Sequence, residues 1–328
     1  MRLLTRVFCC LAILLAGTAS FAHDESIKMA LYQDPAIMRI RGVISVDRAS
    51  QGTGMLIEHE GRRYILTNNH VVQNAMKVWV DHPKTRIPLA VDMIGRDLIL
   101  DLALLSVPPE FASVPTIRFG NPAEVAAGDE VYAIGYPYGS RSITIGFINS
   151  HELMHEVFIL TQAPLNHGNS GGALFNSRHE VVGVNAAFQR DANLFGYAVP
   201  ADYVVRILPR LIDEKIVRHG SPHVRVANSW DLLPIFFESN GLPYPPSRFG
   251  VMVVGFDDAV AKQSGLRVGD VITHLDGKDI ASARDIIREM IFEYRDGDQA
   301  VFTVARYSET HHVTLTFRDP VIVEPKKR

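Results

Sequence analysis

The chain has 328 residues, of which 47% are hydrophobic and 21% are charged, and its formal net charge is −3. This length predicts two domains, or one large domain with a smaller partner, and the composition is typical of a globular protein with a substantial core. No basic stripe runs through the sequence, which argues against a nucleic-acid partner.

Residues 1–22 have the pattern of a secretory signal peptide. Arg2 and Arg6 provide a positive start, Val7–Ala16 is apolar, and small residues follow before the expected cleavage site. The apolar run is too short for a permanent membrane anchor. Both cysteines of the chain lie inside this segment, so the mature protein would contain none. We expect an exported protein of a bacterial envelope, located in the periplasm.

Short strand-like runs separated by turn residues follow this segment. They are Met38–Val46, Met55–Ile57, Tyr64–Thr67, Val78–Val80, Leu89–Ile94, Leu102–Leu105, Glu130–Ile134, Ile143–Ile148, Val157–Thr161, Val181–Val184 and Gly196–Val199. Many short strands at this spacing indicate an all-β barrel or sandwich. The first helical pattern spans Ala201–Val217, and we expect Pro209 to kink or shorten this helix.

A turn-rich break at His219–Pro222 indicates a domain boundary. The pattern after it is α+β, with two helices among four strands. The predicted strands are Val251–Gly255, Val271–Leu275, Ala300–Ala305 and His312–Phe317, and the predicted helices are Ala259–Ser264 and Ser282–Tyr294.

Glycines surround one serine in the segment Gly168-Asn169-Ser170-Gly171-Gly172, which precedes an apolar run. Glycines let the backbone adopt angles that other residues resist and let a ligand approach main-chain N–H groups. A serine that attacks a carbonyl needs such donors aimed at the developing oxyanion. The segment predicts Ser170 as a nucleophile and Gly168, Asn169 and Ser170 as the oxyanion-hole residues, with the N–H groups of Gly168 and Ser170 as donors. A glycine-rich turn between strands explains this segment equally well when it is considered alone.

Two upstream residues favour the catalytic interpretation. His70 follows an apolar strand pattern, where side chains can converge on a cleft, and Asp101 directly precedes another. A serine hydroxyl needs a neighbouring base, and the base needs an acid that orients it. Each residue alone is more easily explained as a loop or turn residue. Together, His70, Asp101 and Ser170 stand in the chain order of the two-barrel serine proteases.

Three segments resemble the catalytic blocks of the HtrA/Deg serine proteases: LTNNHVV at 66–72, DLALL at 101–105 and GNSGGAL at 168–174. The segment AIGYPYG at 133–139 resembles that family's AIGNPFG, and Ser264–Ile272 with Asp276-Gly277-Lys278 resembles the core of a PDZ domain. The resemblance implies His70 as general base, Asp101 as its orienting acid and Ser170 as nucleophile.

The same resemblance implies a mostly β fold with two domains. A two-barrel, trypsin-like (chymotrypsin-fold) protease domain is expected over residues 23–218, an α+β PDZ domain over 219–318, and a tail over 319–328. The implied function is a serine endopeptidase that cleaves unfolded or damaged envelope proteins through an acyl-enzyme, without a cofactor. Peptides would bind to the PDZ domain, and the protease domains would assemble into a homotrimer or a multiple of it. The alternative is a chaperone-like or scaffold protein whose protease fold rests in a non-catalytic state.

The specificity pocket is expected around Leu165, Asn166 and the segment Gly196-Tyr197-Ala198. Neither stretch contains an acidic residue, so we expect cleavage after small or medium aliphatic residues rather than after Lys or Arg. The family usually carries a glycine in the carboxylate-binding loop of the PDZ domain, whereas His223–Val226 has none. We therefore expect weak or altered recognition of peptide C-termini, with Arg225 as a substitute charge.

A competing motif, His151-Glu152-Leu153-Met154-His155, matches the zinc-protease pattern H-E-x-x-H. That chemistry places two imidazoles one turn apart on a helix. The surrounding sequence instead favours a strand, a loop and a second strand. We therefore expect no metal site here and keep a zinc metalloprotease as the less favoured alternative.

Overall fold

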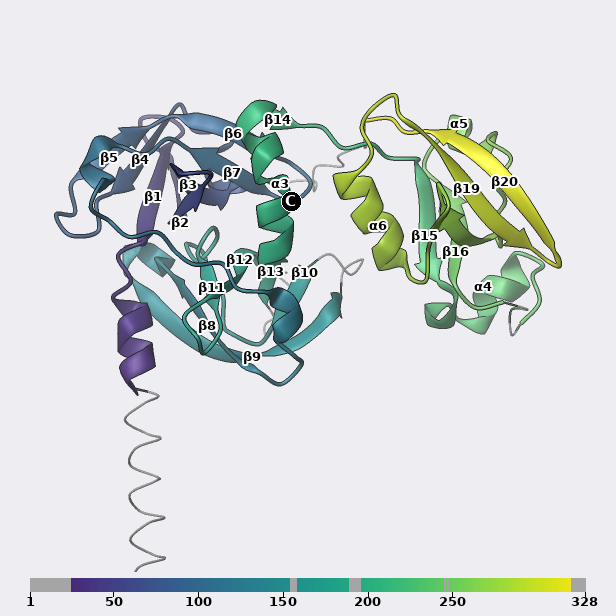
Figure 1. The fold of residues 1–328 in the computed structure, drawn as a ribbon, viewed down its shortest axis with the longest axis horizontal. Coiled ribbons are helices and arrows are strands. Elements are labelled where there is room, and N and C mark those ends of the chain that lie inside the picture. Colours follow the sequence, from purple (N-terminus) through teal and green to yellow (C-terminus); the bar gives the residue numbers. More distant parts are fainter. Residues whose placement is uncertain (1–24, 154–157, 189–195, 245, 247, 320–328) are drawn as a thin grey trace, which may run out of the picture. The chain divides into compact units, whose positions relative to one another are not determined.

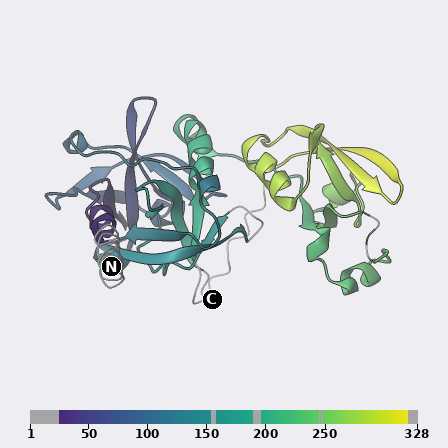
Figure 2. The ribbon, with the colours of Figure 1, turned by 60° about the horizontal axis from the view of Figure 1, so that its bottom comes forward.

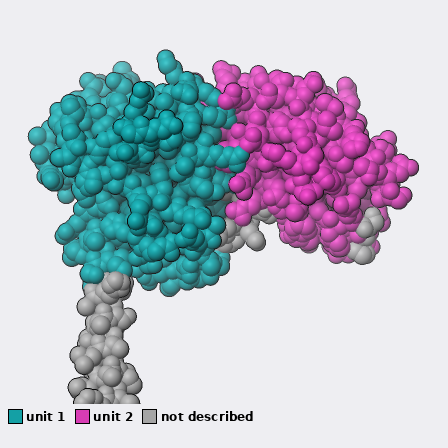
Figure 3. All heavy atoms as spheres, in the orientation of Figure 1, with its two compact units in different colours: residues 1–151, 158–215 teal, residues 152–157, 216–328 magenta. Residues whose placement is uncertain are grey.

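The computed structural model describes residues 25–153, 158–188, 196–244, 246 and 248–319 (Figure 1). The chain divides into two compact units, residues 1–151 with 158–215 and residues 152–157 with 216–328 (Figure 3). The predicted signal peptide and residues 320–328 of the predicted tail lie outside the described residues. None of the helices in the described part of the chain has the length and apolar character needed to cross a membrane.

The first half of unit 1 forms an antiparallel sheet in the order β6-β7-β3-β2-β1-β4-β5, preceded by a helical segment at residues 25–32. Its strands are β1 (Ile37–Val43), β2 (Ala49–His59), β3 (Arg62–Asn68), β4 (Lys77–Asp81), β5 (Pro88–Val91), β6 (Met93–Asp97) and β7 (Leu102–Leu105). The prediction of a single strand at Leu89–Ile94 is wrong, because the strand is interrupted at Asp92, between β5 and β6. The Asp92 N–H donates to Ser106 Oγ at 2.9 Å instead of continuing the ladder.

The second half of unit 1 closes into a barrel in the order β10-β13-β12-β11-β8-β9 (Figure 2). Its strands are β8 (Glu130–Gly135), β9 (Ser142–Leu153), β10 (Phe158–Thr161), β11 (Ala173–Phe175), β12 (Val181–Phe188) and β13 (Gly196–Pro200). Inward-facing apolar side chains fill the barrel, among them Val131, Ile148, Ile159, Leu174, Val182 and Ala198. The predicted mostly β class is confirmed.

Helix α3 (Ala201–Asp213) follows the barrel and buries an apolar face that includes Val204, Leu208 and Leu211. It packs closely on the first sheet, because a β-carbon at Gly95 would meet Leu211 O at 1.8 Å. The helix contains Pro209 and ends before the predicted Val217. The remaining short helices of unit 1 are α2 (Asn69–Val72), η1 (Pro109–Phe111), η2 (Pro122–Glu124) and η3 (Pro137–Gly139).

Unit 2 contains a sheet in the order β15-β16-β17-β19-β20, with β18 paired to β17. Its strands are β15 (Val224–Asn228), β16 (Val251–Phe256), β17 (Val271–Leu275), β18 (Lys278–Asp279), β19 (Gln299–Arg306) and β20 (Glu309–Thr316), and β14 (Ile216–Val217) precedes them. The helices are η4 (Ser229–Asp231), α4 (Pro234–Ser239), α5 (Ala259–Lys262) and α6 (Ala283–Phe292).

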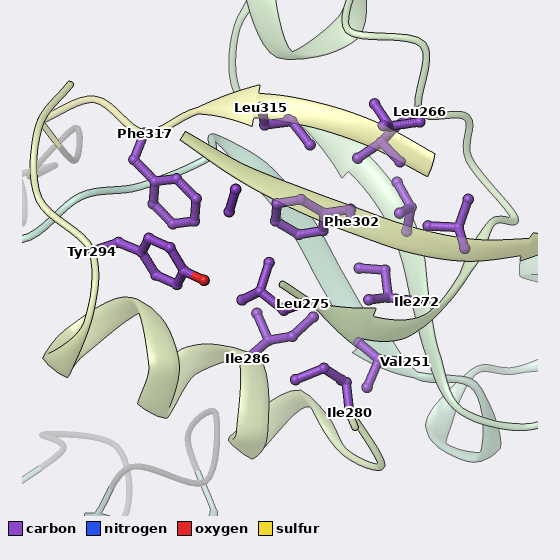
Figure 4. Close-up of a cluster of buried hydrophobic side chains, with 14 of the residues drawn as sticks. Val251, Leu266, Ile272, Leu275, Ile280, Ile286, Tyr294, Phe302, Leu315 and Phe317 are labelled. Carbon is purple, nitrogen blue, oxygen red and sulfur yellow. The ribbon is translucent and has the colours of Figure 1, made fainter. Parts of the chain in front are cut away.

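The sheet of unit 2 buries apolar side chains on both faces. Successive side chains of a strand point to opposite faces, and here Val251 and Val253 of β16 belong to one cluster while Met252 belongs to another. Helix α6 covers the first cluster, which also contains Ile286 and Phe302 (Figure 4). Helix α4 covers the second through Phe237. The sequence pattern had predicted neither α4 nor the edge strand β15.

An acidic side chain links α5 to the end of the sheet in unit 2. Asp258 accepts from the Ala261 N–H at 2.8 Å and from the Arg318 guanidinium at 2.5 and 3.1 Å. These hydrogen bonds, that of Arg318 first, lower the pKa of Asp258 to about 2. The charged carboxylate is therefore the form that the folded unit prefers.

Acidification should destabilise unit 2 through Asp258. Because the folded pKa lies below the value near 3.8 of an unperturbed aspartate, the contribution is present above pH 4 and is lost as the pH falls towards 2. We expect Asp258→Asn, which retains a capping oxygen, to lower the melting temperature at pH 6 and to flatten its decline between pH 4 and pH 2. Calorimetry across this range measures both effects. Asp257→Asn is the matched control, and an equally flattened profile for that variant would contradict the assignment.

Candidate active site

His70 lies in the one-turn helix α2, which begins where strand β3 ends. His70 thus follows the strand, as the sequence pattern predicts, and it lies in the first turn of the short helix. Val71 and Val72 are buried and fix this helix on the sheet, whereas the His70 side chain is 41% exposed. The buried Val71 and Val72 thus position the helix, while the imidazole of His70 stays accessible.

Asp101 faces His70 because their strands are paired. In the register of β3 and β7, Asn68 lies opposite Leu102, so the residues next to each of them come together. His70 Nδ1 lies 2.6 Å from Asp101 Oδ2, and the His70 backbone N–H donates to Oδ1 at 2.8 Å. A carboxylate that accepts from Nδ1–H leaves Nε2 of the neutral imidazole as the proton acceptor.

The backbone of Asp101 is also held in place. Its φ is +53°, a region that residues with a side chain seldom adopt. Its carbonyl oxygen accepts from the Asn69 N–H at 3.0 Å and from Asn68 Nδ2 at 2.8 Å. These two bonds to the β3–α2 junction stabilise the conformation, so the acid is oriented through both its side chain and its backbone.

The loop that carries Ser170 packs directly on the first sheet. Gly171 has a φ of +81°, and a β-carbon there would meet Thr53 O at 2.2 Å and Thr67 Oγ1 at 2.3 Å. Only glycine fits this position. The Thr53 N–H donates to Ser170 O at 2.8 Å, which ties the serine itself to strand β2.

Gly52 marks the place where the histidine helix and the serine loop meet. A β-carbon at Gly52 would lie 2.6 Å from a methyl group of Val71 and 3.1 Å from Ser170 O. Val71 is the neighbour of His70 in α2. The structure therefore brings His70, Asp101 and Ser170, which are distant in sequence, to one site.

The Ser170 hydroxyl donates to the backbone carbonyl of Ala186 at 3.0 Å. Within the described part of the chain it makes no hydrogen bond with His70. Ala186 belongs to β12 and is buried. In this conformation the hydroxyl proton is therefore hydrogen-bonded to a backbone carbonyl of strand β12.

The two N–H groups predicted as oxyanion-hole donors, those of Gly168 and Ser170, have no intramolecular acceptor among the described residues. The N–H of Asn169, the third residue assigned to the hole, donates to Asn166 O at 2.9 Å within the loop. The two neighbouring carbonyl oxygens are engaged elsewhere. Gly168 O accepts from Thr53 Oγ1 at 2.6 Å, and His167 O accepts from the Tyr138 N–H at 3.3 Å.

Thr53 is the functional residue that the sequence pattern did not identify. It is fully buried, and its hydroxyl donates to Gly168 O while accepting from the Tyr136 N–H at 3.0 Å. It thereby fixes the orientation of the peptide that follows Gly168. The local signal was a hydroxyl residue between two glycines inside a strand, which is otherwise an unfavourable combination for a strand.

The residues predicted for the specificity pocket come from two neighbouring segments. Leu165 is partly buried and lies over β13, where a β-carbon at Gly196 would meet it at 2.5 Å. Tyr197 and Ala198 are buried in the same strand, opposite Leu160 and Ile159.

Asn166, the remaining predicted pocket residue, is exposed, and its carbonyl oxygen accepts from Asn169. The structure thus places Leu165 against Gly196 and leaves Asn166 at the surface of the loop.

The H-E-x-x-H segment lies on a strand where the structure describes it. His151, Glu152 and Leu153 belong to β9, and Met154 and His155 lie outside the described residues. The helical turn that a zinc protease requires is absent from the described part of the motif. Among the described residues, no group of three or more His, Cys, Asp or Glu side chains is arranged to hold a metal ion.

The segment predicted as the carboxylate-binding loop, His223–Val226, lies mostly in β15, the edge strand of the sheet in unit 2, and only His223 precedes that strand. His223 has a φ of +55°, and its N–H donates to Ser221 Oγ at 3.1 Å. Arg225 is opposite Gly255, and its Nε lies 3.4 Å from Asp257 Oδ1. One N–H of this loop is therefore already engaged, and the guanidinium is partly neutralised.

Two family models match the chain. Residues 52–184 match the trypsin-like peptidase domain, and residues 225–317 match the PDZ domain. The first segment contains His70, Asp101 and Ser170, and the second contains nearly the whole sheet of unit 2.

Relatives and solved structures with the same combination are similar to this chain. A probable periplasmic serine endoprotease, DegP-like, of Ectopseudomonas mendocina (strain ymp) is 35% identical over 292 residues, which is 86% of this chain and 59% of the relative. A protein of the same description from Pseudomonas fulva (strain 12-X) is 36% identical over 267 residues, which is 78% of this chain and 53% of the relative. The structure of the HtrA-type protease AlgW with a tripeptide matches with a TM-score of 0.69 and 27% identity, over 88% of this chain and 95% of AlgW.

The chain spans between 53% and 59% of the length of these two relatives. Over that span it has the peptidase domain followed by the PDZ domain. The match to the AlgW structure extends over 95% of the AlgW chain. The chain belongs to the HtrA/Deg family of serine proteases, in which a trypsin-like peptidase domain is followed by a PDZ domain.

Proposed function

We propose that the protein is a serine endopeptidase that cleaves unfolded or damaged proteins of the cell envelope. The observation that carries this proposal is the contact of 2.6 Å between His70 Nδ1 and Asp101 Oδ2, next to a serine loop with two N–H groups available. The relatives described as periplasmic proteases support a periplasmic location for this chain. Assembly into a homotrimer, or a multiple of it, is part of the same proposal.

In the proposed reaction, His70 Nε2 takes the proton from Ser170 Oγ as that oxygen attacks the scissile carbonyl carbon. The N–H groups of Gly168 and Ser170 donate to the oxyanion of the tetrahedral intermediate. Protonated His70 then gives its proton to the leaving amine, and an acyl-enzyme remains on Ser170. Water, activated by the same imidazole, releases the acid product. Asp101 stabilises the imidazolium throughout and stays ionised.

The hydrogen bond from Ser170 Oγ to Ala186 O favours a resting state before substrate binds. The hydroxyl proton must turn from Ala186 O before it can reach His70. Catalytic hydrogen bonds often form only in the substrate complex. The same observation supports the second candidate, a chaperone-like or scaffold protein with a non-catalytic protease fold.

The proposed specificity is for small or medium aliphatic side chains on the N-terminal side of the cleaved bond. Leu165 occupies the space above Gly196, which limits the depth of the pocket. Apolar walls without a paired acidic group would leave a Lys or Arg side chain with an uncompensated charge.

The PDZ domain is proposed to bind peptides of substrates or regulators along the edge strand β15. The segment His223–Val226 contains no glycine, and the N–H of His223 is engaged with Ser221. Fewer N–H groups are therefore available to a terminal carboxylate.

Replacing Ser170 with Ala should lower the rate of casein cleavage by roughly ten-thousandfold or more, because the nucleophile is lost. The rate is measured from peptide release, and mass spectrometry of the native protein treated with a fluorophosphonate locates the label. Ser177→Ala, which changes an exposed serine of the same unit, is the matched control and should retain full activity. Equal casein cleavage by the native protein and Ser170→Ala would favour the chaperone-like alternative. Loss of activity with a chelator would favour the metalloprotease.

Shortening Leu165 should widen the range of cleaved bonds. We expect the native protein to cut an unfolded protein mainly after residues such as Ala and Val. Leu165→Ala, which opens the space above Gly196, should add cuts after Leu and Phe. Mass spectrometry of the digestion products measures the distribution, with Gln162→Ala in the same loop as control. A majority of cuts after Lys or Arg would contradict the proposed pocket.

The PDZ domain should discriminate little between a free and an amidated peptide C-terminus. We expect the dissociation constants of two labelled peptides that differ only in this group to lie within about threefold, since each lost charge-assisted hydrogen bond removes a substantial share of the preference. Arg225→Gly should increase the preference for the free acid, whereas Arg225→Ala, which removes the charge without adding a glycine, should not. Fluorescence anisotropy measures the affinities. A strong preference of the native protein for the free carboxylate would refute the expectation.

A further inference from the structure

A cavity of about 90 Å³ lies on the α4 face of the sheet in unit 2. It is separate from the face that α6 covers, because its floor residues Met252 and Val271 alternate along their strands with Val251 and Ile272 of the α6 cluster. Figure 4 shows that opposite cluster. The cavity therefore belongs neither to the protease site nor to the cluster under α6.

The floor of the cavity consists of apolar, buried side chains. Phe237 of α4 is fully buried, Met252 is 2% exposed and Val271 is 5% exposed. Leu242 forms part of the wall and lies flat against Gly269, whose φ is +95° and where a β-carbon would meet Leu242 at 2.6 Å. These contacts leave a preformed hydrophobic space.

The lining of the cavity is strongly basic. Arg248, Arg267 and Arg306 all line it, together with a single acidic residue, Asp270. Arg306 is fully engaged, because it donates to both carboxylate oxygens of Asp270, at 2.7 and 2.8 Å, and to Gly265 O at 2.8 Å. The charge of the buried Asp270 is thus balanced within the protein.

The other two guanidinium groups have no acidic partner in the described part of the chain. Arg248 is exposed and makes no ion pair there. Arg267 is engaged through its backbone, whose N–H donates to Asp270 Oδ2 at 2.8 Å and whose carbonyl oxygen accepts from the Asp270 N–H at 3.1 Å. Two uncompensated positive charges beside an apolar floor attract a molecule with an anionic head and a hydrophobic tail.

We propose that this cavity, which we name the α4 pocket, binds an aliphatic carboxylate through Arg248 and Arg267. One water occupies roughly 10–15 Å³ in this measure of volume, so the space holds about six to nine water-sized groups. That matches a chain of roughly six to eight carbons, with the tail on Phe237, Met252 and Val271. The proposal is independent of the proteolytic activity.

Two sources of this chemistry fit the same space. One is a free medium-chain fatty acid, and the other is the C-terminal residue of a hydrophobic peptide, which also joins an aliphatic group to a carboxylate. The pocket needs no added β-strand in either case, in contrast to binding along β15.

Calorimetric titration of the full chain with octanoate tests the proposal. We expect saturable binding of one octanoate per chain, at least tenfold tighter than that of octylamine or octanol, because only octanoate satisfies both the charge and the apolar floor. Arg248→Gln combined with Arg267→Gln should weaken octanoate binding tenfold or more. Ala305→Leu, which places a larger side chain in the lining, should abolish octanoate binding. Lys262→Gln, which removes one positive charge from α5 outside the lining, should leave it unchanged.

Peptides distinguish the two sources. N-acetyl-Gly-Leu as the free acid is compared with its amide and with octanoate, in the native protein and in Ala305→Leu. Competition between the free-acid peptide and octanoate would assign the pocket to peptide C-termini, and binding of octanoate alone would assign it to fatty acids. Failure of both to bind, equal binding of octylamine, or an equal loss in Lys262→Gln would overturn the proposal.

Discussion

The close packing of Gly171 on Thr53 joins the two strand systems of the protease unit, and the geometry of the active site depends on this contact. A side chain at Gly171 would overlap Thr53 O and Thr67 Oγ1, and would separate the serine loop from the sheet that carries His70. Thr53 adds directional bonds from its N–H to Ser170 O and from its hydroxyl to Gly168 O. One strand residue therefore sets both the position of the nucleophile and the orientation of the peptide beside it.

The parts of the catalytic machinery differ in how far they are assembled. The imidazole and carboxylate of His70 and Asp101 are in contact, and the N–H groups of Gly168 and Ser170 are available, whereas the Ser170 hydroxyl is directed to Ala186. The hydrogen bond of the Ser170 hydroxyl must therefore change before its proton can reach His70. Activity in such a site can be controlled by whatever favours that change, including the substrate itself.

The sheet of unit 2 gives one small domain two different surfaces. Alternation along β16 and β17 directs one set of side chains to α6 and the other to α4. The edge strand β15 remains open to a peptide, while the α4 face has an apolar floor beside Arg248 and Arg267, which have no acidic partner among the described residues. These surfaces share the strands but no side chains, so ligands could bind to them separately. Gly269, with a positive φ and no side chain, lets Leu242 pack against its backbone and close one side of the α4 pocket.

The sequence by itself determined the mostly β class, most strands, and the order and types of the residues at the site, because apolar runs, turn glycines and the setting of Ser170 are local patterns. It did not predict β15, whose side chains are mostly half-buried, or α4, which is short and begins with Pro234. Only the tertiary structure decided that Asn169 is engaged with Asn166, that Thr53 anchors the serine loop, and that Arg248 and Arg267 line one cavity. These contacts depend on strand register and on backbone approach between segments that are distant in sequence. No local pattern encodes either of them.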